Sequence, residues 1–188
     1  MAARNDLITK HIADISALEK HILEAVERQR ESEAVKSNVD VNRVVMDIER
    51  VLTSHIAALD TLAASYDGEG EAEIKKALLA AAGVAAGLYD RLRESELTRD
   101  LRDDYTALSL ATMGYTAMHA FALGISEPRM ADLSGRHLSD LTPLLIELSK
   151  LIPVTTITDL AKEHPDLGVD TSKISEAVEN TQRAWSRA

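Results

Sequence analysis

Apolar residues recur at intervals of three and four over long stretches of the chain, and this spacing restricts its fold more than any other feature. In the segment 98–123 the repeat includes Leu101, Tyr105, Leu108 and Tyr115. Because an α-helix has 3.6 residues per turn, such spacing gathers apolar side chains on one face of a helix. The pattern therefore predicts an all-α protein, in which long amphipathic helices pack against one another as an antiparallel bundle.

Interruptions of the repeat divide the chain into five principal helices. The expected helices cover residues 5–33, 40–66, 71–96, 98–123 and 128–151. Asp40 is expected to cap the second helix and Ser126 the fifth, because both side chains accept hydrogen bonds from the free N–H groups of a helix start. Pro143 is expected to kink or split the fifth helix, and Pro153 to end the bundle, because proline lacks the N–H that continues a helix.

The segment 71–96 differs from the other four because it is rich in alanine. Gly83 and Gly87 lie one turn apart in it, and small residues let a neighbouring helix approach closely. Its longest uncharged run is shorter than the roughly 20 residues that cross a bilayer, so we interpret its small residues as close packing inside a soluble bundle rather than as a membrane dimer motif. Residues 1–152 are thus predicted to form the bundle, and 153–188 a helical C-terminal appendage.

The charge and composition of the chain exclude several classes of function. A formal net charge of −10 argues against nucleic acid and anionic lipid as partners, because both require clustered Lys and Arg. The chain has no Cys, which excludes disulfides, thiolate metal sites and cysteine nucleophiles. Residues 1–20 carry charges throughout and lack the apolar stretch of a signal peptide. We therefore expect a soluble, cytoplasmic protein with no membrane or nucleic-acid partner.

Polar residues on the apolar faces are the candidates for chemistry. Glu19, His55 and His137 each interrupt the apolar face of a different predicted helix. One inward side chain per helix is how metal sites in bundles are built, and His and Glu are ligands for iron, zinc or manganese. The alternative is a metal-free core, in which each His is hydrogen-bonded to a neighbour and Tyr115 is a packed aromatic. His119 lies near the end of its helix, too far along to share one ion with the other three.

The order of these segments resembles a known family. The predicted helices contain, in order, the stretches DISALEKHILEAVERQ, SHIAALDTLA and TRDLRDDYTALSLATMGYTAMHAFALGI, followed by a final long helix. In helix order and spacing, residues 6–151 resemble the bacterial ferritin-like proteins of the YciE/YciF kind. The resemblance implies a ferritin-like four-helix bundle with a long crossover (here the alanine-rich segment), commonly dimeric, in proteins associated with stress. It also implies metal ligands: Glu19 matches the first-helix Glu, His55 matches the second-helix His, and Asp140 falls near a fourth-helix acidic position beside His137.

The sequence departs from these relatives at positions that a two-metal site needs. Residues 56–58 are apolar where relatives carry acidic residues, and the neighbours of Tyr115 replace a segment rich in Glu and His. Glu49 and Asp60 lie only at the flank of the second helix's apolar face. A di-iron site needs about four Glu and two His, since bridging carboxylates balance the charge of two cations. We therefore expect neither ferroxidase nor oxygenase activity.

Three functions are compatible with this sequence. The first is a non-catalytic, stress-associated binding or structural protein that acts as a homodimer. The second is a metalloprotein whose core holds iron, zinc or manganese on Glu19, His55 and His137. The third is a carrier of an apolar ligand between helices, suggested by the small-residue crossover. Self-association is expected through residues 77–88 or through the apolar residues of the C-terminal tail.

Overall fold

The computed structural model describes residues 2–66 and 96–186, and the regular structure in these two ranges is helical, with no strand. The elements are α1 (Ala2–Arg30), α2 (Glu33–Ser37), α3 (Val39–Ala64), α5 (Glu96–Gly124), α6 (Pro128–Glu163) and α7 (Ile174–Trp185), with short 3-10 helices at Pro165–Leu167 and Thr171–Lys173. The all-α prediction is confirmed for the described part of the chain. Nearly all of the predicted crossover helix, with Gly83 and Gly87, lies outside it.

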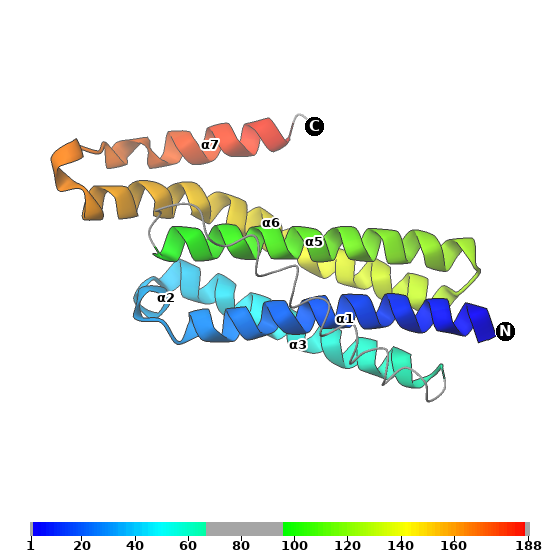
Figure 1. The fold of residues 1–188 in the computed structure, drawn as a ribbon. Helices are drawn as coiled ribbons and strands as arrows, with labels where there is room; N and C mark the ends of the chain where they lie inside the picture. Colours follow the sequence, from blue (N-terminus) through cyan, green and yellow to red (C-terminus); the bar gives the residue numbers. More distant parts are fainter. Residues whose placement is uncertain (1, 67–95, 187–188) are drawn as a thin grey trace.

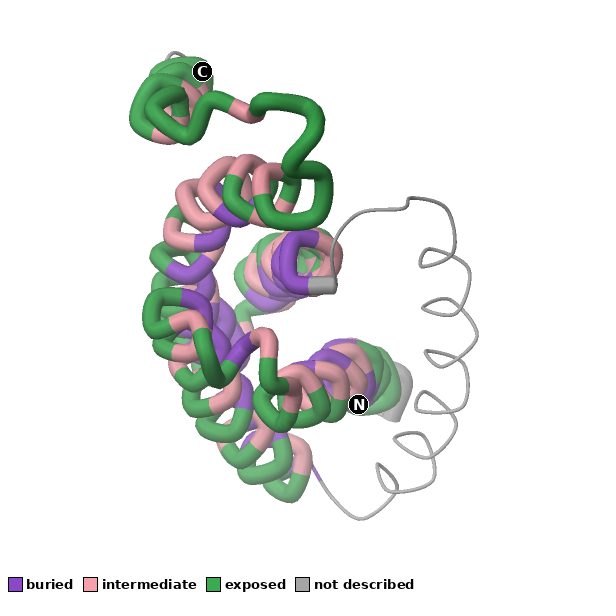
Figure 2. The backbone as a smooth tube through the Cα atoms, turned by 90° about the vertical axis from the view of Figure 1, so that its left-hand side faces the viewer, coloured by how far each residue is buried: buried purple, intermediate pink, exposed green. Residues whose placement is uncertain are grey.

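Four long helices enclose the core. α1 packs against α3 and α5, and α6 packs against the same two helices from the other side (Figure 1). Buried residues lie on the sides of these helices that face one another (Figure 2). The largest fully buried side chains are Ile8, Ile12, Ile48, Leu52, Leu59, Leu101, Leu108, Tyr115, Met118, Met130, Leu141 and Leu148. Burial of each such side chain stabilises the fold by about 1.5–3 kcal/mol, which is why the spacing of apolar residues determines the helix faces.

The connection between α1 and α3 differs from the prediction because two side chains in it each cap the start of a helix. Ser32 accepts a hydrogen bond from the Val35 N–H at 3.2 Å and starts the short helix α2, which the sequence analysis did not include. Asn38 accepts one from the Val41 N–H at 3.2 Å and is the N-cap of α3. The expectation that Asp40 caps this helix is therefore wrong, and Asp40 lies inside its first turn.

Helix α6 begins and ends differently from the prediction. Ser126 does not cap it: this residue has a positive φ of 56°, and Glu127 occupies the N-cap without a side-chain hydrogen bond. Pro143 does not split the helix and Pro153 does not end it, since α6 continues to Glu163. Each proline removes only one N–H from the backbone ladder. Buried residues on both sides of each proline, among them Leu141, Leu144, Leu148 and Thr155, hold the helix in place.

Helix α7 follows α6 and packs along it. The Trp185 ring meets the edge of Tyr105 at 5.6 Å between centroids, and the Gln182 amide donates to the Ser149 hydroxyl at 3.0 Å. No residue of α7 is buried, and Trp185 stays about half exposed. The predicted appendage 153–188 thus begins inside α6 and ends in a helix that is attached to it along one side. None of the described helices is both long and apolar enough to span a membrane.

Candidate metal centre

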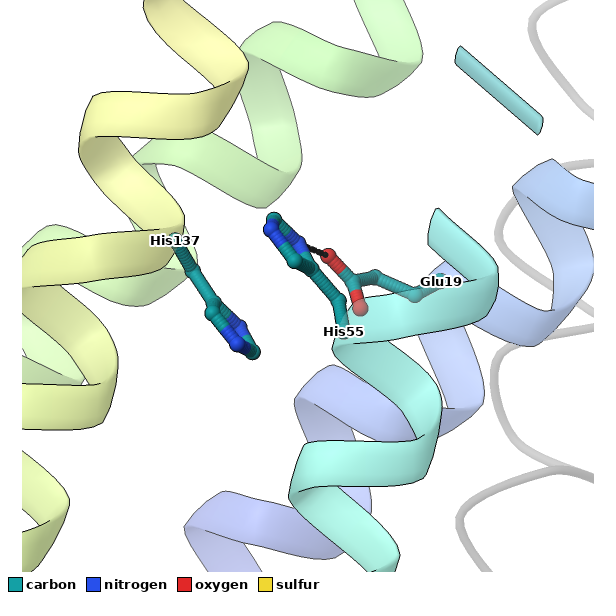
Figure 3. A group of neighbouring side chains, drawn as sticks. All are labelled: Glu19, His55 and His137. Atoms are coloured by element: carbon teal, nitrogen blue, oxygen red, sulfur yellow. Dashed lines mark hydrogen bonds and ion pairs between the residues drawn. The ribbon is translucent and has the colours of Figure 1, made fainter. Parts of the chain in front are cut away.

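Each of the four long helices contributes one buried polar or aromatic side chain to the same part of the core. Glu19 comes from α1, His55 from α3, Tyr115 from α5 and His137 from α6, and their exposed fractions are 0%, 2%, 0% and 4%. Figure 3 shows Glu19, His55 and His137, whose side chains point toward one another from α1, α3 and α6. The sequence pattern predicted that Glu19, His55 and His137 face inward, and that prediction is confirmed.

Apolar neighbours at helical spacing explain why these polar groups are buried. Glu19 lies between Ile15 and Ile22 on the inner face of α1, and all three side chains are buried. His55 lies in the same way between Leu52 and Leu59 on α3. Because the apolar residues one turn away fix the face that each helix turns to the core, the polar residue between them is carried inside.

The distances between these side chains are close to those of a metal site. The Nδ1 atom of His55 lies 3.0 Å from Oε1 of Glu19. One ligand atom from each of Glu19, His55 and His137 can be chosen so that all three lie within 4.8 Å of one another, the one such group among the described residues. Atoms that bind one zinc ion at about 2.0–2.2 Å lie roughly 3–4 Å apart. The present spacing is therefore somewhat wider than that around a bound ion, and side-chain rotation is needed to close the group.

Asp140 and His119, two further polar residues named from the sequence, do not belong to the group of Glu19, His55 and His137. The Oδ2 atom of Asp140 lies 3.4 Å from Nε2 of His55, on the side of the ring opposite Glu19, and the Asp140 side chain is 57% exposed. Asp140 is thus placed as a partner of His55 at the surface of the site. The His119 ring is 2.9 Å from the Ala131 carbonyl through Nδ1 and takes no part.

The flanking carboxylates of α3 are held in ion pairs away from the core. Glu49 accepts from the Arg30 guanidinium at 2.7 and 2.8 Å, and Asp60 accepts from Lys20 at 3.2 Å. Neither residue belongs to the group of Glu19, His55 and His137. The prediction that they lie beside the apolar face rather than on it is confirmed.

Among the described residues, three buried polar atoms of the site make no hydrogen bond of normal geometry, although the Tyr115 hydroxyl interacts with the Glu19 carboxylate. They are Oε2 of Glu19, Nδ1 of His137 and the hydroxyl oxygen of Tyr115. A buried polar group without a partner costs about 1–3 kcal/mol of stability. Two of these three atoms are a carboxylate oxygen and an imidazole nitrogen, which are the donor types that first-row transition metals prefer. The residues present therefore fit a metal ion.

Burial controls the protonation of the site. It lowers the pKa of His137 to about 3, with the neighbouring His55 and Arg136 adding to the effect. Burial also raises the pKa of Glu19, against the hydrogen bond and the charge of His55, which lower it. At neutral pH the His137 ring is therefore uncharged and keeps a free lone pair on one nitrogen, as a metal ligand must.

Comparison of the chain with protein-family models, with curated proteins and with solved structures finds no match. The likeness to ferritin-like proteins of the YciE/YciF kind thus remains a prediction from the sequence. The assignment of chemistry to this core rests on the side chains themselves.

A second buried polar pair, which the sequence analysis missed, lies at the junction of α1 and α5. The Gln29 amide donates to Oδ1 of Asp104 at 2.9 Å, and the Asp104 residue is 3% exposed. Burial raises the pKa of Asp104 to about 7, against the Gln29 hydrogen bond, which lowers it, and the charges of Asp100 and Asp103 raise it further. The signal was present in the sequence, because Asp104 lies three residues after Leu101 on the same apolar face.

Proposed function

We propose that the protein binds one divalent transition-metal ion in its core, with Glu19, His55 and His137 as the protein ligands. The observation that carries this proposal is the convergence of three ligand atoms from three helices in a fully buried position. Two imidazoles and one carboxylate leave coordination positions for water or a small ligand. This ligand set suits zinc, and it also suits iron(II) or manganese.

Ligation requires one imidazole ring to turn. The His55 and His137 rings are parallel, and a metal binds a ring nitrogen in the plane of its ring, so one ion cannot lie in both planes at once. Both nitrogens of His55 already face carboxylates, Glu19 on one side and Asp140 on the other. Nδ1 of His137 has no hydrogen-bond partner in the ranges 2–66 and 96–186, so rotation of His137 breaks no hydrogen bond to these residues at that atom. His137 is therefore the ring that turns.

Asp140 completes the site from outside. With Nδ1 of His55 bound to the metal, its Nε2 carries the proton and donates to the Asp140 carboxylate. Such a carboxylate–imidazole contact fixes the tautomer and the orientation of a ligating His, and its loss typically weakens metal binding 10- to 100-fold. This role accounts for the position of Asp140 at the edge of the core.

The ferritin-like, non-catalytic homodimer associated with stress is the second candidate. It is supported by the shortage of inward carboxylates, since one three-residue group among the described residues does not provide the bridging ligands of a dinuclear site. The exposed helix α7, with its half-exposed Trp185, favours self-association in this candidate. A single core metal is compatible with it, and the metal then serves to hold the three helices α1, α3 and α6 together.

Equilibrium titration of the untagged, metal-free protein with zinc against a competing chelator tests the proposal. We expect one zinc per chain, and a loss of at least roughly tenfold in affinity for Glu19→Gln and for His137→Gln. Glu49→Gln is the matched control, because Glu49 is an α3 carboxylate paired with Arg30 at the surface. Helix content from circular dichroism shows that each variant is folded. Absence of stoichiometric binding, or equal losses in Glu49→Gln and Glu19→Gln, would overturn the proposal.

A further inference from the structure

A groove on the surface leads to the buried site. It has a volume of about 320 Å³ and runs between α3 and α6. The lining residues are Asp47, Arg50, Val51, Ser54 and His55 of α3, and Asp140, Pro143, Leu144 and Glu147 of α6. His55 is among them although it is only 2% exposed. The groove therefore reaches inward to one of the three proposed metal ligands.

The carboxylates of the groove differ in their partners. Asp47 pairs with Arg50 at 3.1 Å, and Glu147 pairs with Lys150 at 2.8 Å and with Arg43 at 3.7 Å. Asp140 has no Lys or Arg partner in the described ranges, and its one ion-pair contact there is with His55. Asp140 is thus the groove carboxylate whose negative charge is available to a cation from solvent.

We infer that the metal ion enters the core through this groove, and that Asp140 is the positioning residue that receives it and passes it to His55. The inference rests on the proposed metal site. The His55 ring connects the two environments: its Nε2 faces the exposed Asp140 at 3.4 Å, and its Nδ1 faces the buried Glu19 at 3.0 Å. A carboxylate, an imidazole and a second carboxylate therefore lie in succession between solvent and the core, and an ion moves past the edge of the His55 ring to reach Nδ1.

An entry route through the groove predicts an effect on the rates of metal association and dissociation. A residue that acts only as a metal ligand does not predict this effect. Obstruction of an entry route slows association and dissociation by the same factor and leaves the dissociation constant unchanged. Loss of a ligand, in contrast, raises the dissociation constant. Ser54 is exposed and lines the groove without contacting the proposed ligands by any hydrogen bond, so a large side chain at this position narrows the route and spares the site.

The experiment mixes the full-length, metal-free protein with cobalt(II) or zinc(II) in a stopped-flow instrument and measures release with an excess of chelator. In Ser54→Trp we expect both rates to fall roughly tenfold with the dissociation constant unchanged. Thr53→Trp is the matched control, since Thr53 is exposed on the same helix and does not line the groove. Asp140→Asn should slow association at low salt, and the effect should shrink as salt screens the charge. Asp132→Asn, which removes an exposed carboxylate of α6 outside the groove, should leave association unchanged.

The outcomes separate the two proposals. If wild type binds one ion per chain and Ser54→Trp behaves as Thr53→Trp does, the groove is not the route and the metal site stands. If the Asp140→Asn variant loses affinity entirely through faster release, with association unchanged, Asp140 acts only on the bound state and the inference fails for this residue. If wild type binds no ion stoichiometrically, both the metal site and its entry route are rejected.

Discussion

The imidazole rings of His55 and His137 are stacked, with 2° between their planes and 3.6 Å between their centroids. Two charged rings at this distance would repel each other strongly in a buried position, so at least one of them is neutral. The edges of both rings meet the Tyr115 ring, at 5.9 Å and 4.9 Å between centroids. The core of this protein therefore contains a cluster of two imidazoles and one phenol ring, and the protonation of the imidazoles affects its stability.

His137 should remain neutral in the folded protein far below the usual range. Burial lowers its pKa from 6.5 to about 3, so between these two pH values the unfolded chain binds a proton that the folded chain does not. The free energy of unfolding therefore falls as the pH falls from 6.5 toward 3, and His137→Gln should reduce this pH dependence. Nitrogen chemical shifts of the His side chains, followed from pH 7 to pH 4, report the protonation directly. Titration of His137 near pH 6.5 would contradict this account.

Asp104→Asn should stabilise the protein at alkaline pH. Because burial raises the pKa of Asp104 from 3.8 to about 7, the folded state keeps a proton that the unfolded state loses, and stability falls as the pH rises through this window. The neutral amide removes this penalty, for an expected gain on the order of 1–3 kcal/mol at pH 8 and little gain at pH 4. Urea unfolding at both pH values measures it, with the exposed Asp132→Asn as the control. Equal effects at the two pH values would show that the charge of Asp104 is not responsible.

Gly114 allows α1 and α5 to approach closely beside the candidate site. A Cβ atom at this position would lie 2.6 Å from Cδ1 of Ile15, which lies four residues before Glu19 on α1. Because Cδ1 is the end of the Ile15 side chain and can shift by rotation, Gly114→Ala should cost at most about 1–3 kcal/mol, less the roughly 1 kcal/mol by which Ala is favoured over Gly in a helix. At Gly135 the nearest atom to an added Cβ is 3.9 Å away, so Gly135→Ala should stabilise the protein by the helix preference of Ala over Gly without a steric cost.

A double-mutant cycle identifies the contact. In an Ile15→Val background, which removes the opposing methyl group, the cost of Gly114→Ala should largely disappear. Thermal unfolding of the four variants gives the coupling between the two positions. An unchanged cost in the Ile15→Val background would mean that the approach of α1 to α5 is not what requires glycine here.

Ferrous iron should not be oxidised faster by this protein than in buffer. Two ions a few ångströms apart repel unless carboxylates bridge them, and α3 directs Glu49 and Asp60 into surface ion pairs instead. Oxygen consumption after addition of ferrous iron measures the activity, and native mass spectrometry counts the ions. Rapid oxidation with two irons per chain, lost in Glu19→Ala and His55→Ala, would reverse this conclusion.

The sequence predicted the inward residues because burial is a local property of a helix face. Glu19, His55 and His137 each lie one turn from apolar residues, and the helix period alone decides where they point. The same rule places Asp104 inside, because it lies three residues after Leu101 on the same apolar face. The helix period does not determine the distance between the faces of different helices. The stacking of the two imidazoles therefore could not be predicted from it.

The helix ends were harder to predict because several side chains compete for each free backbone group. Asn38 and Asp40 are both suitable caps, and in the structure Asn38 is the N-cap while Asp40 lies in the first turn. Pro153 is a strong local signal for a helix end, yet it removes one backbone hydrogen bond and α6 continues past it, with Thr155 buried on the far side. The local sequence signal alone therefore did not determine these helix ends.

The location of a bound metal tests the central claim most directly. Crystals of the zinc-loaded protein, measured on both sides of the zinc absorption edge, show where the ion lies. The account predicts one anomalous peak per chain, within about 2.0–2.3 Å of one atom from each of Glu19, His55 and His137, with the His137 ring turned out of its stack on His55. A core in which the two rings remain parallel, with zinc only on surface carboxylates or not bound, would contradict it.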